Sequence, residues 1–201
     1  MFSLFTTTPP AFRDDIVLQG ERILLRPLSA DDADEMFLYA SDPQVTEFLP
    51  WLPAPDASAV RPFLVEQVSR RKRSESMGFA IIARDTGAMI GSTDLMDLRL
   101  KRGQGELGYL IAREFWGQGL MTEAAHLTVA YGFDRLNLSC VIAFADAENG
   151  ASLRVLEKLG MERTVAETRI VKMESRPYVR YELTRAVWNA RREKTRQPES
   201  E

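Results

Sequence analysis

One segment constrains the fold of this chain more than any other: an apolar run at residues 108–112 leads through a turn that contains Gly117 and Gly119 into an amphipathic helix. The first N–H groups of a helix have no acceptor within the helix, and the helix dipole places partial positive charge there. Glycine takes positive φ readily, so phosphate oxygens can approach successive N–H groups of such a turn. The segment therefore predicts a strand, a turn and a helix that together bind a phosphate group.

The spacing of the glycines narrows the class of phosphate ligand. A dinucleotide-binding turn would carry a third glycine at position 122, where this chain has Thr122. A P-loop would carry Gly-Lys followed by Ser or Thr at the helix start, and that sequence is absent here. A nicotinamide dinucleotide is therefore the least favoured ligand.

Hydrophobic periodicity and turn residues predict the remaining elements. Strands are expected at residues 23–28, 79–83, 89–98, 104–112, 140–144, 164–173 and 178–183, with a turn at 174–177. Helices are expected at about 30–40, 57–71, 119–133, 151–159 and 186–192. The strand, helix and strand between 104 and 144 form a parallel crossover. We expect a mixed α/β (α+β) fold, with a central, twisted, mostly antiparallel sheet, one parallel crossover and helices on both faces.

The length of 201 residues, of which 45% are hydrophobic, suits one globular domain. Threonines and prolines before residue 11 predict that residues 1–20 form an extended N-terminal arm. The domain itself is expected to span residues 21–192, and the polar residues 193–201 a flexible C-terminal tail.

Charge and composition exclude several classes of protein. The net charge of −3 argues against nucleic acid as a partner, and the basic run at residues 70–73 is interpreted as a solvated helix end. No apolar run approaches the roughly 18 residues needed to cross a bilayer, and the start has no leader pattern, so we expect a cytoplasmic protein without a membrane partner. With one cysteine and one histidine, the chain offers no cluster of metal ligands, so no metal is expected.

Two ordered blocks resemble the acetyl-CoA-binding core of the GNAT superfamily, and most closely its RimJ/RimL-type N-acetyltransferases. The first comprises Glu106-Leu107-Gly108-Tyr109 and the turn Phe115-Trp116-Gly117-Gln118-Gly119. The second comprises Asn149-Gly150-Ala151-Ser152 and the run from Val155 to Met161. The resemblance covers about residues 21–188 and implies acetyl-CoA as co-substrate. It assigns cofactor binding to Leu110, Ile111, Ala112, Gly117, Gln118, Gly119, Leu120, Met121, Thr122 and Asn149.

The same resemblance implies that an amine attacks the thioester directly, while N–H groups near Leu110 and Ile111 polarise the acetyl carbonyl. Glu106 is the candidate base, because strand alternation places it on the same face as Gly108 and Leu110. A solvent-facing role for Glu106 stays open, with Glu167 and Glu174 as weaker alternatives.

Ser152 is the candidate proton donor to the departing thiolate, although a serine at a helix start is equally suited to capping. Asn149 has the same two readings, a helix cap or a hydrogen bond to the pantetheine arm. Tyr109 and Trp116 are interpreted as packing side chains, and Trp51 either lines a substrate groove or covers the edge of the core.

An N-terminal α-amine, as in the ribosomal-protein type, is the expected acceptor. At pH 7 an α-amine with a pKa near 7.8 is about 14% neutral, whereas a lysine amine near 10.4 is only about 0.04% neutral. Small amines such as polyamines, aminoglycosides or amino acids are the alternative, and Asp94 and Asp97 hint at the acidic mouth that polyamines would favour. A non-catalytic acyl-CoA-binding module is a further alternative, and the sequence leaves a homodimer open.

Overall fold

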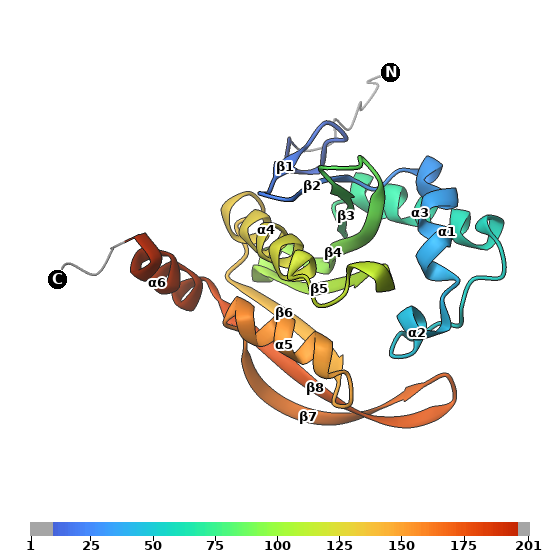
Figure 1. Cartoon of the computed structure of the whole chain (residues 1–201). Coiled ribbons are helices and arrows are strands. Elements are labelled where there is room, and N and C mark those ends of the chain that lie inside the picture. Colours follow the sequence, from blue (N-terminus) through green and yellow to red (C-terminus); the bar gives the residue numbers. More distant parts are fainter. Residues whose placement is uncertain (1–9, 197–201) are drawn as a thin grey trace, which may run out of the picture.

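The computed structural model describes residues 10–196, which form a sheet flanked by helices (Figure 1). The strands are β1 (Leu18–Gln19), β2 (Ile23–Pro27), β3 (Met77–Ala83), β4 (Met89–Arg99), β5 (Gln104–Ile111), β6 (Cys140–Asp146), β7 (Glu162–Val171) and β8 (Glu174–Thr184). Their order in the sheet is β1-β2-β3-β4-β5-β6-β8-β7. Neighbouring strands pair antiparallel except for β5 and β6, which pair parallel. The predicted fold class is therefore confirmed.

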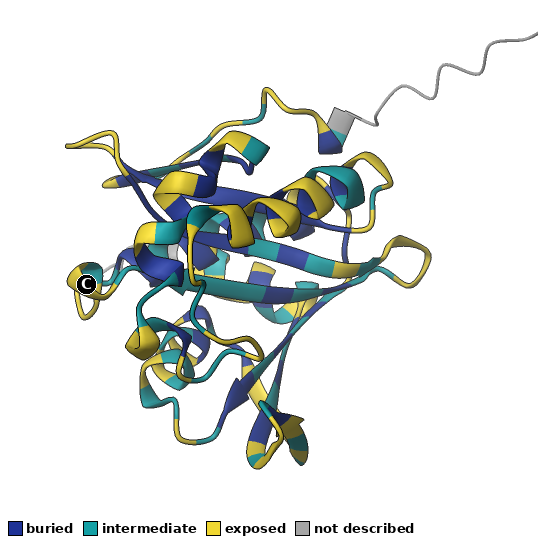
Figure 2. Cartoon of the chain, turned by 90° about the vertical axis from the view of Figure 1, so that its right-hand side faces the viewer, coloured by how far each residue is buried: buried dark blue, intermediate teal, exposed yellow. Residues whose placement is uncertain are grey.

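Helices cover both faces of the sheet (Figures 1 and 2). They are α1 (Ala33–Ala40), α2 (Pro43–Thr46), α3 (Ala57–Lys72), α4 (Leu120–Asp134), α5 (Gly150–Leu159) and α6 (Arg185–Arg196). Short 3₁₀ turns occupy Pro10–Phe12, Ala30–Asp32, Leu100–Arg102 and Arg113–Phe115. Among the described residues, no helix is long and apolar enough to cross a membrane.

The core has two parts because the central strands are buried on both faces. On one face, Phe79 and Ile81 of β3 pack in a cluster with apolar residues of α4 and α5. On the other face, Ala80 and Ile82 of β3 pack with residues of α1 and α3. The alternation of side chains along β3 thus joins the two helical layers through one strand.

The tip of the β7–β8 hairpin differs from the prediction. The turn predicted at residues 174–177 is wrong, because these residues belong to β8 and pair with β7, up to Val171 opposite Glu174. The chain reverses instead at Lys172 and Met173, which both take positive φ, as a two-residue hairpin turn requires. Pro177 is tolerated because the β6 ladder ends beside it, at the pair Asp146 and Tyr178.

The two ends of the domain are more ordered than expected where the structure describes them. Phe12 is 3% exposed and β1 pairs with β2, so residues 10–20 are not a free arm. Helix α6 continues to Arg196, which makes the first part of the expected tail, residues 193–196, helical. Residues 1–9 of the expected arm and 197–201 of the tail lie outside the described residues.

The basic run at the end of α3 is not wholly solvated either. Arg71 is 3% exposed, donates a hydrogen bond to the carbonyl oxygen of Leu28 at 2.8 Å and pairs with Asp14. A buried guanidinium needs such partners, because an unpaired charge there would be costly. Arg71 therefore anchors the N-terminal segment, whereas Lys72 and Arg73 are exposed as predicted.

Candidate functional site

The β5 and β6 strands separate near the middle of the sheet. Their parallel pairing ends at Glu106 opposite Ile142, although β4 continues to pair with β5 as far as Ile111. On the other side, β8 continues to pair with β6 as far as Asp146. Residues 107–111 of β5 thus have no ladder with β6, and their backbone groups on this side can bind a ligand.

A cavity of about 1530 Å³ opens at this separation. Nine of the predicted site residues line it: Glu106, Leu110, Ile111, Gly117, Gly119, Met121, Thr122, Asn149 and Ser152. The predicted cofactor residues Ala112, Gln118 and Leu120 are not among its lining residues. Leu120 is buried, and the Gln118 side chain donates to the carbonyl oxygen of Glu114 at 2.9 Å.

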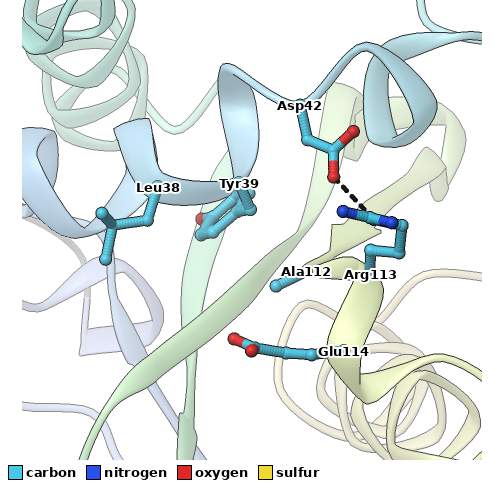
Figure 3. Close-up of a pocket in the computed structure, with 6 residues that line it drawn as sticks. All are labelled: Leu38, Tyr39, Asp42, Ala112, Arg113 and Glu114. Atoms are coloured by element: carbon cyan, nitrogen blue, oxygen red, sulfur yellow. Dashed lines mark hydrogen bonds and ion pairs between the residues drawn. The ribbon is translucent and has the colours of Figure 1, made fainter.

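Ala112 instead lines a smaller cavity of about 420 Å³ between α1 and the turn after β5 (Figure 3). There Arg113 pairs with Asp42, with 2.8 Å between Nε and Oδ2. The pair ties the turn after β5 to the start of α2 and orients the Arg113 guanidinium toward Asp42.

The turn before α4 has the geometry that its glycines predict. Gly117 and Gly119 take φ of 74° and 79°, and an ideal Cβ on Gly117 would meet nothing within 4 Å. Gly119 is the N-cap of α4 and provides no side-chain cap, so no side chain there competes for the first N–H groups of the helix. The turn is open, amide-lined and at the positive end of a helix dipole, which fits a phosphate group.

Arg22, which is distant in the sequence from the turn before α4, also stabilises that turn. Its Nη1 donates to the carbonyl oxygen of Gln118 at 2.8 Å, and its Nε pairs with Glu123 at 3.1 Å. Trp116 fixes the other end, because its indole N–H donates to the carbonyl oxygen of Ile111 at 2.9 Å. The sequence interpretation of Trp116 as a packing side chain missed this bond, and the Arg22 contact spans about a hundred residues of chain.

Glu106 lies on the cavity side of β5, half-buried, as strand alternation predicted. Burial raises the pKa of its carboxyl above the ordinary value, and Glu167 and Asp97 act in the same direction, whereas Arg169 lowers it. The Arg169 guanidinium stacks on the ring of Phe144, 3.6 Å from its centroid, and also pairs with Glu167. Glu167 is thereby engaged by Arg169, and Glu174 lies at the hairpin end of β8.

Asp94 is a second carboxyl in the cavity. In the sequence it was noted, together with Asp97, only as a sign of an acidic mouth. It lies on β4 opposite Gly108, and its Oδ1 would be 2.5 Å from a Cβ placed on that glycine. Burial, followed by the charge of Glu106, raises the pKa of Asp94 to about 7. Asp97, by contrast, is exposed and pairs with Arg70 at 2.8 Å. The hairpin register of β4 and β5, extrapolated from the sequence, could have found Asp94.

A hydroxyl pair spans the cavity from β5 to α5. The hydroxyl of Tyr109 lies 2.9 Å from Oγ of Ser152 and 3.2 Å from its carbonyl oxygen. Burial raises the pKa of Tyr109. Asn149 caps α5, because its Oδ1 accepts from the N–H of Ser152 at 3.0 Å. Asn149 is therefore a helix cap, which is one of the two roles expected for it. Tyr109 was expected only to pack, but its hydroxyl also contacts Ser152.

Two further expectations from the sequence concern Trp51 and the absence of metal ligands. Trp51 lines the cavity and is 38% exposed, in a loop whose residues Phe48 to Pro55 all line it. Within the described part of the chain, no group of three His, Cys, Asp or Glu side chains is placed to hold a metal ion.

Comparisons with known proteins agree with this geometry. The sequence model of the GNAT acetyltransferase domain matches residues 22–162. The chain is 32% identical over 146 residues to the uncharacterised N-acetyltransferase p20 of Bacillus licheniformis, covering 73% of this chain and 82% of that protein. It is 27% identical to the spermidine N(1)-acetyltransferase of Escherichia coli K12, covering 69% and 72%. A GCN5-related N-acetyltransferase structure from Brucella melitensis superposes with a TM-score of 0.77 at 25% identity, over 93% of this chain and 86% of that one.

Proposed function

Because the chain belongs to the GNAT family and is an acetyl-CoA-dependent N-acetyltransferase, we propose that its acceptor is the α-amine at the N-terminus of a protein. The observation that carries this choice is the composition of the cavity wall on the side of the 48–55 loop. It is built largely from apolar side chains of the 48–55 loop, α2 and α3, including Phe48, Leu49, Trp51, Leu52 and Phe63. An extended peptide end with apolar residues fits such a passage better than a polycation does.

The chemistry of the acceptor leads to the same choice. An α-amine is already about 14% neutral at pH 7, so it needs only a moderate base, whereas a lysine amine needs a much stronger one. The carboxyls of Asp94 and Glu106 both line the cavity, where they could bind the single ammonium group of a peptide end. The β7–β8 tip contacts the end of α2 beside the cavity, since Nζ of Lys172 donates to the carbonyl oxygen of Thr46 at 2.8 Å.

The donor side is assigned to the turn and the separated strands. Amides of residues 117–122 would hold the pyrophosphate, and the gap between β5 and β6 would take the pantetheine arm. When bound, acetyl-CoA supplies the activated acetyl group as a thioester. The N–H groups near Leu110 and Ile111 would then donate to its carbonyl oxygen, which gains negative charge during attack.

Three side chains are assigned to proton movement. Glu106 would accept a proton from the incoming amine, because burial raises the pKa of its carboxyl above the ordinary value and makes it a stronger base. Ser152 and Tyr109 would share one hydroxyl network that protonates the leaving sulfur. These roles extend the family assignment to residues of this chain.

A small amine is the second candidate acceptor, and the carboxyl pair favours it. Asp94 and Glu106 face the cavity together and could bind a second ammonium group of a polyamine. The relative from E. coli is a spermidine acetyltransferase, at 27% identity. Turnover measured with a panel of acceptor amines separates the two proposals.

The test is thiol release from acetyl-CoA with four acceptor classes: N-terminal peptides, polyamines, aminoglycosides and free amino acids. We expect release with peptides that carry a free α-amine, and none with the same peptides blocked at the N-terminus. Glu106→Gln should bind acetyl-CoA normally and lose most of the peptide turnover. Turnover with a small amine alone would overturn the peptide proposal in favour of the second candidate.

A further inference from the structure

We propose that Asp94 is a second proton acceptor of the acetyl-transfer reaction, seated beside the reaction centre by Gly108. The inference rests on the proposed function of the same site, and it assigns a catalytic residue in addition to Glu106. Two structural observations support it: the register of β4 against β5, and the space above Gly108. A chemical requirement adds to them, namely the number of protons that the acceptor must lose.

The register places Asp94 nearer to the reaction centre than Glu106. Asp94 lies opposite Gly108, and Met96 lies opposite Glu106, so the two carboxyls share one face of the sheet two residues apart along β5. Gly108 precedes Leu110 by two residues and Glu106 precedes it by four. At about 3.4 Å per residue, the register position of Asp94 is therefore about 7 Å nearer than that of Glu106, measured along the strand, to the amides that would hold the acetyl carbonyl.

Gly108 provides the space that Asp94 occupies. A Cβ on Gly108 would come within 2.5 Å of Oδ1 of Asp94 and within 2.3 Å of Cε of Met96. Gly108 does not have positive φ, unlike Gly117 and Gly119, so its backbone conformation does not demand glycine. The space above Gly108 is taken instead by two side-chain ends, the methyl group of Met96 and the carboxyl of Asp94, which lies against the strand backbone.

The reaction includes two proton transfers from the nitrogen, and each carboxyl can accept one of these protons. A protonated primary amine loses two protons before it becomes an amide N–H. Its nitrogen forms the bond to the acetyl carbon as the carbon–sulfur bond breaks, the departing thiolate takes up one proton, and the other reaches water. With two acceptors, Glu106 can take the proton that frees the amine for attack, and Asp94 the proton that leaves the nitrogen once the new bond forms.

The charges around the pair set the pH at which they work. Burial raises the pKa of Asp94 most, and the charges of Glu106 on β5 and Asp97 on β4 add to it, whereas Arg70 on α3 and the backbone N–H of Gly108 lower it. Around Glu106, Arg169 on β7 opposes the effects of Asp97 and Glu167. Removing the charge of Glu106 should therefore make Asp94 a stronger acid.

The experiment compares Asp94→Asn, Glu106→Gln and the control Asp97→Asn, by kcat at saturating acetyl-CoA and acceptor between pH 5.5 and 9. Asp97 is the same residue type on the same strand but outside the cavity, and asparagine tolerates its positive φ. We expect Asp94→Asn to lower kcat by about 10²-fold or more, without changing the KM for acetyl-CoA, and to remove the acid limb of the profile near pH 7. Glu106→Gln should move that limb to lower pH, whereas Asp97→Asn should keep kcat and move the limb less, because the charge of Asp97 has a smaller effect on Asp94 than that of Glu106.

A second variant tests the position of the Asp94 carboxyl rather than its ability to accept a proton. Gly108→Ala should displace the Asp94 carboxyl, because only the flexible ends of Asp94 and Met96 need to move, and should lower kcat without removing any ionisable group. The inference is overturned if Asp94→Asn keeps kcat and the acid limb, or, where that variant does not fold, if Gly108→Ala keeps them. The best acceptor of the wild-type panel serves as substrate, so a small-amine result would overturn the peptide proposal and leave this comparison intact.

Discussion

The hydroxyl of Tyr109 on β5 lies 2.9 Å from Oγ of Ser152 on α5, across the separation of β5 and β6. The contact joins two segments that are 43 residues apart in the chain. Because burial raises the pKa of Tyr109, its hydroxyl keeps its proton at alkaline pH and remains a hydrogen-bond donor. The pair therefore offers one connected source of a proton for a leaving group in the cavity.

Tyr109→Phe is expected to lower kcat by about 10²-fold, the smaller end of the range for a lost general acid. Ser152→Ala should lower kcat less, because the Tyr109 hydroxyl still has the carbonyl oxygen of residue 152 as a partner. The double variant should be no slower than Tyr109→Phe alone, since the two hydroxyls act as one unit.

Tyr131→Phe is the control for this pair. Tyr131 is also a buried tyrosine with a hydrogen-bonded hydroxyl, which donates to the carbonyl oxygen of Ala11, but it lies outside the cavity. It should cost about 1 kcal/mol of stability and leave kcat unchanged. Strictly additive losses in the double variant would show that Tyr109 and Ser152 do not share one proton path.

Gly117→Ala is expected to weaken acetyl-CoA binding, and Gly87→Ala is its matched control. The two glycines have φ of 74° and 73°, and a Cβ on either would meet nothing within 4 Å. Each variant should therefore lose about 1–2 kcal/mol of stability from backbone strain. Only Gly117→Ala should raise the KM for acetyl-CoA, by about tenfold or more, because it disturbs amides that face the ligand. Equal KM values for both variants would contradict a phosphate site at this turn.

Arg22→Ala should also raise the KM for acetyl-CoA, by a less direct route. Arg22 binds the carbonyl oxygen of Gln118 and the carboxylate of Glu123, so its loss frees the turn without touching a ligand. Arg84→Ala is the control, because Arg84 is likewise exposed and donates to the carbonyl oxygen of Gly20 at 3.0 Å, away from the cavity. Urea melts of both variants should be similar, and a rise in KM with Arg84→Ala would point to a general loosening of the domain.

The stability of the wild type should fall between about pH 4 and pH 7 through Asp94. Its pKa rises from 3.8 to about 7 on folding, so in this range the folded state binds more protons than the unfolded state. The contribution is fully present below pH 3.8 and lost as pH rises through 7, by about 4 kcal/mol at most. Asp94→Asn lacks this loss, so its free energy of unfolding relative to wild type should be higher at pH 8 than at pH 4.5. An unchanged difference between the two pH values, measured by urea unfolding, would contradict a carboxyl with this pKa.

The sequence predicted elements whose causes are local. The turn at Gly117 and Gly119 follows from the positive φ that each glycine permits, and the parallel crossover follows from the order of strand, helix and strand. Glu106 reached the cavity face because alternation along one strand is a local property. The turn predicted at residues 174–177 failed for the same reason: Pro177 is a local turn signal, but the end of the β6 ladder removed its cost.

What only the tertiary structure decided depends on which segments meet. The sequence by itself determined the fold class, the amide-lined turn and the place of Glu106 on the cavity face, because propensity, periodicity and glycine conformation act over a few residues. Strand register and packing decided four further features. These are the separation of β5 from β6, the position of Asp94 over Gly108, the hydrogen bond between Tyr109 and Ser152, and the burial of Arg71. These relationships join residues distant in the chain, and each exists only because the free energy of the whole folded core fixes the strands in one register.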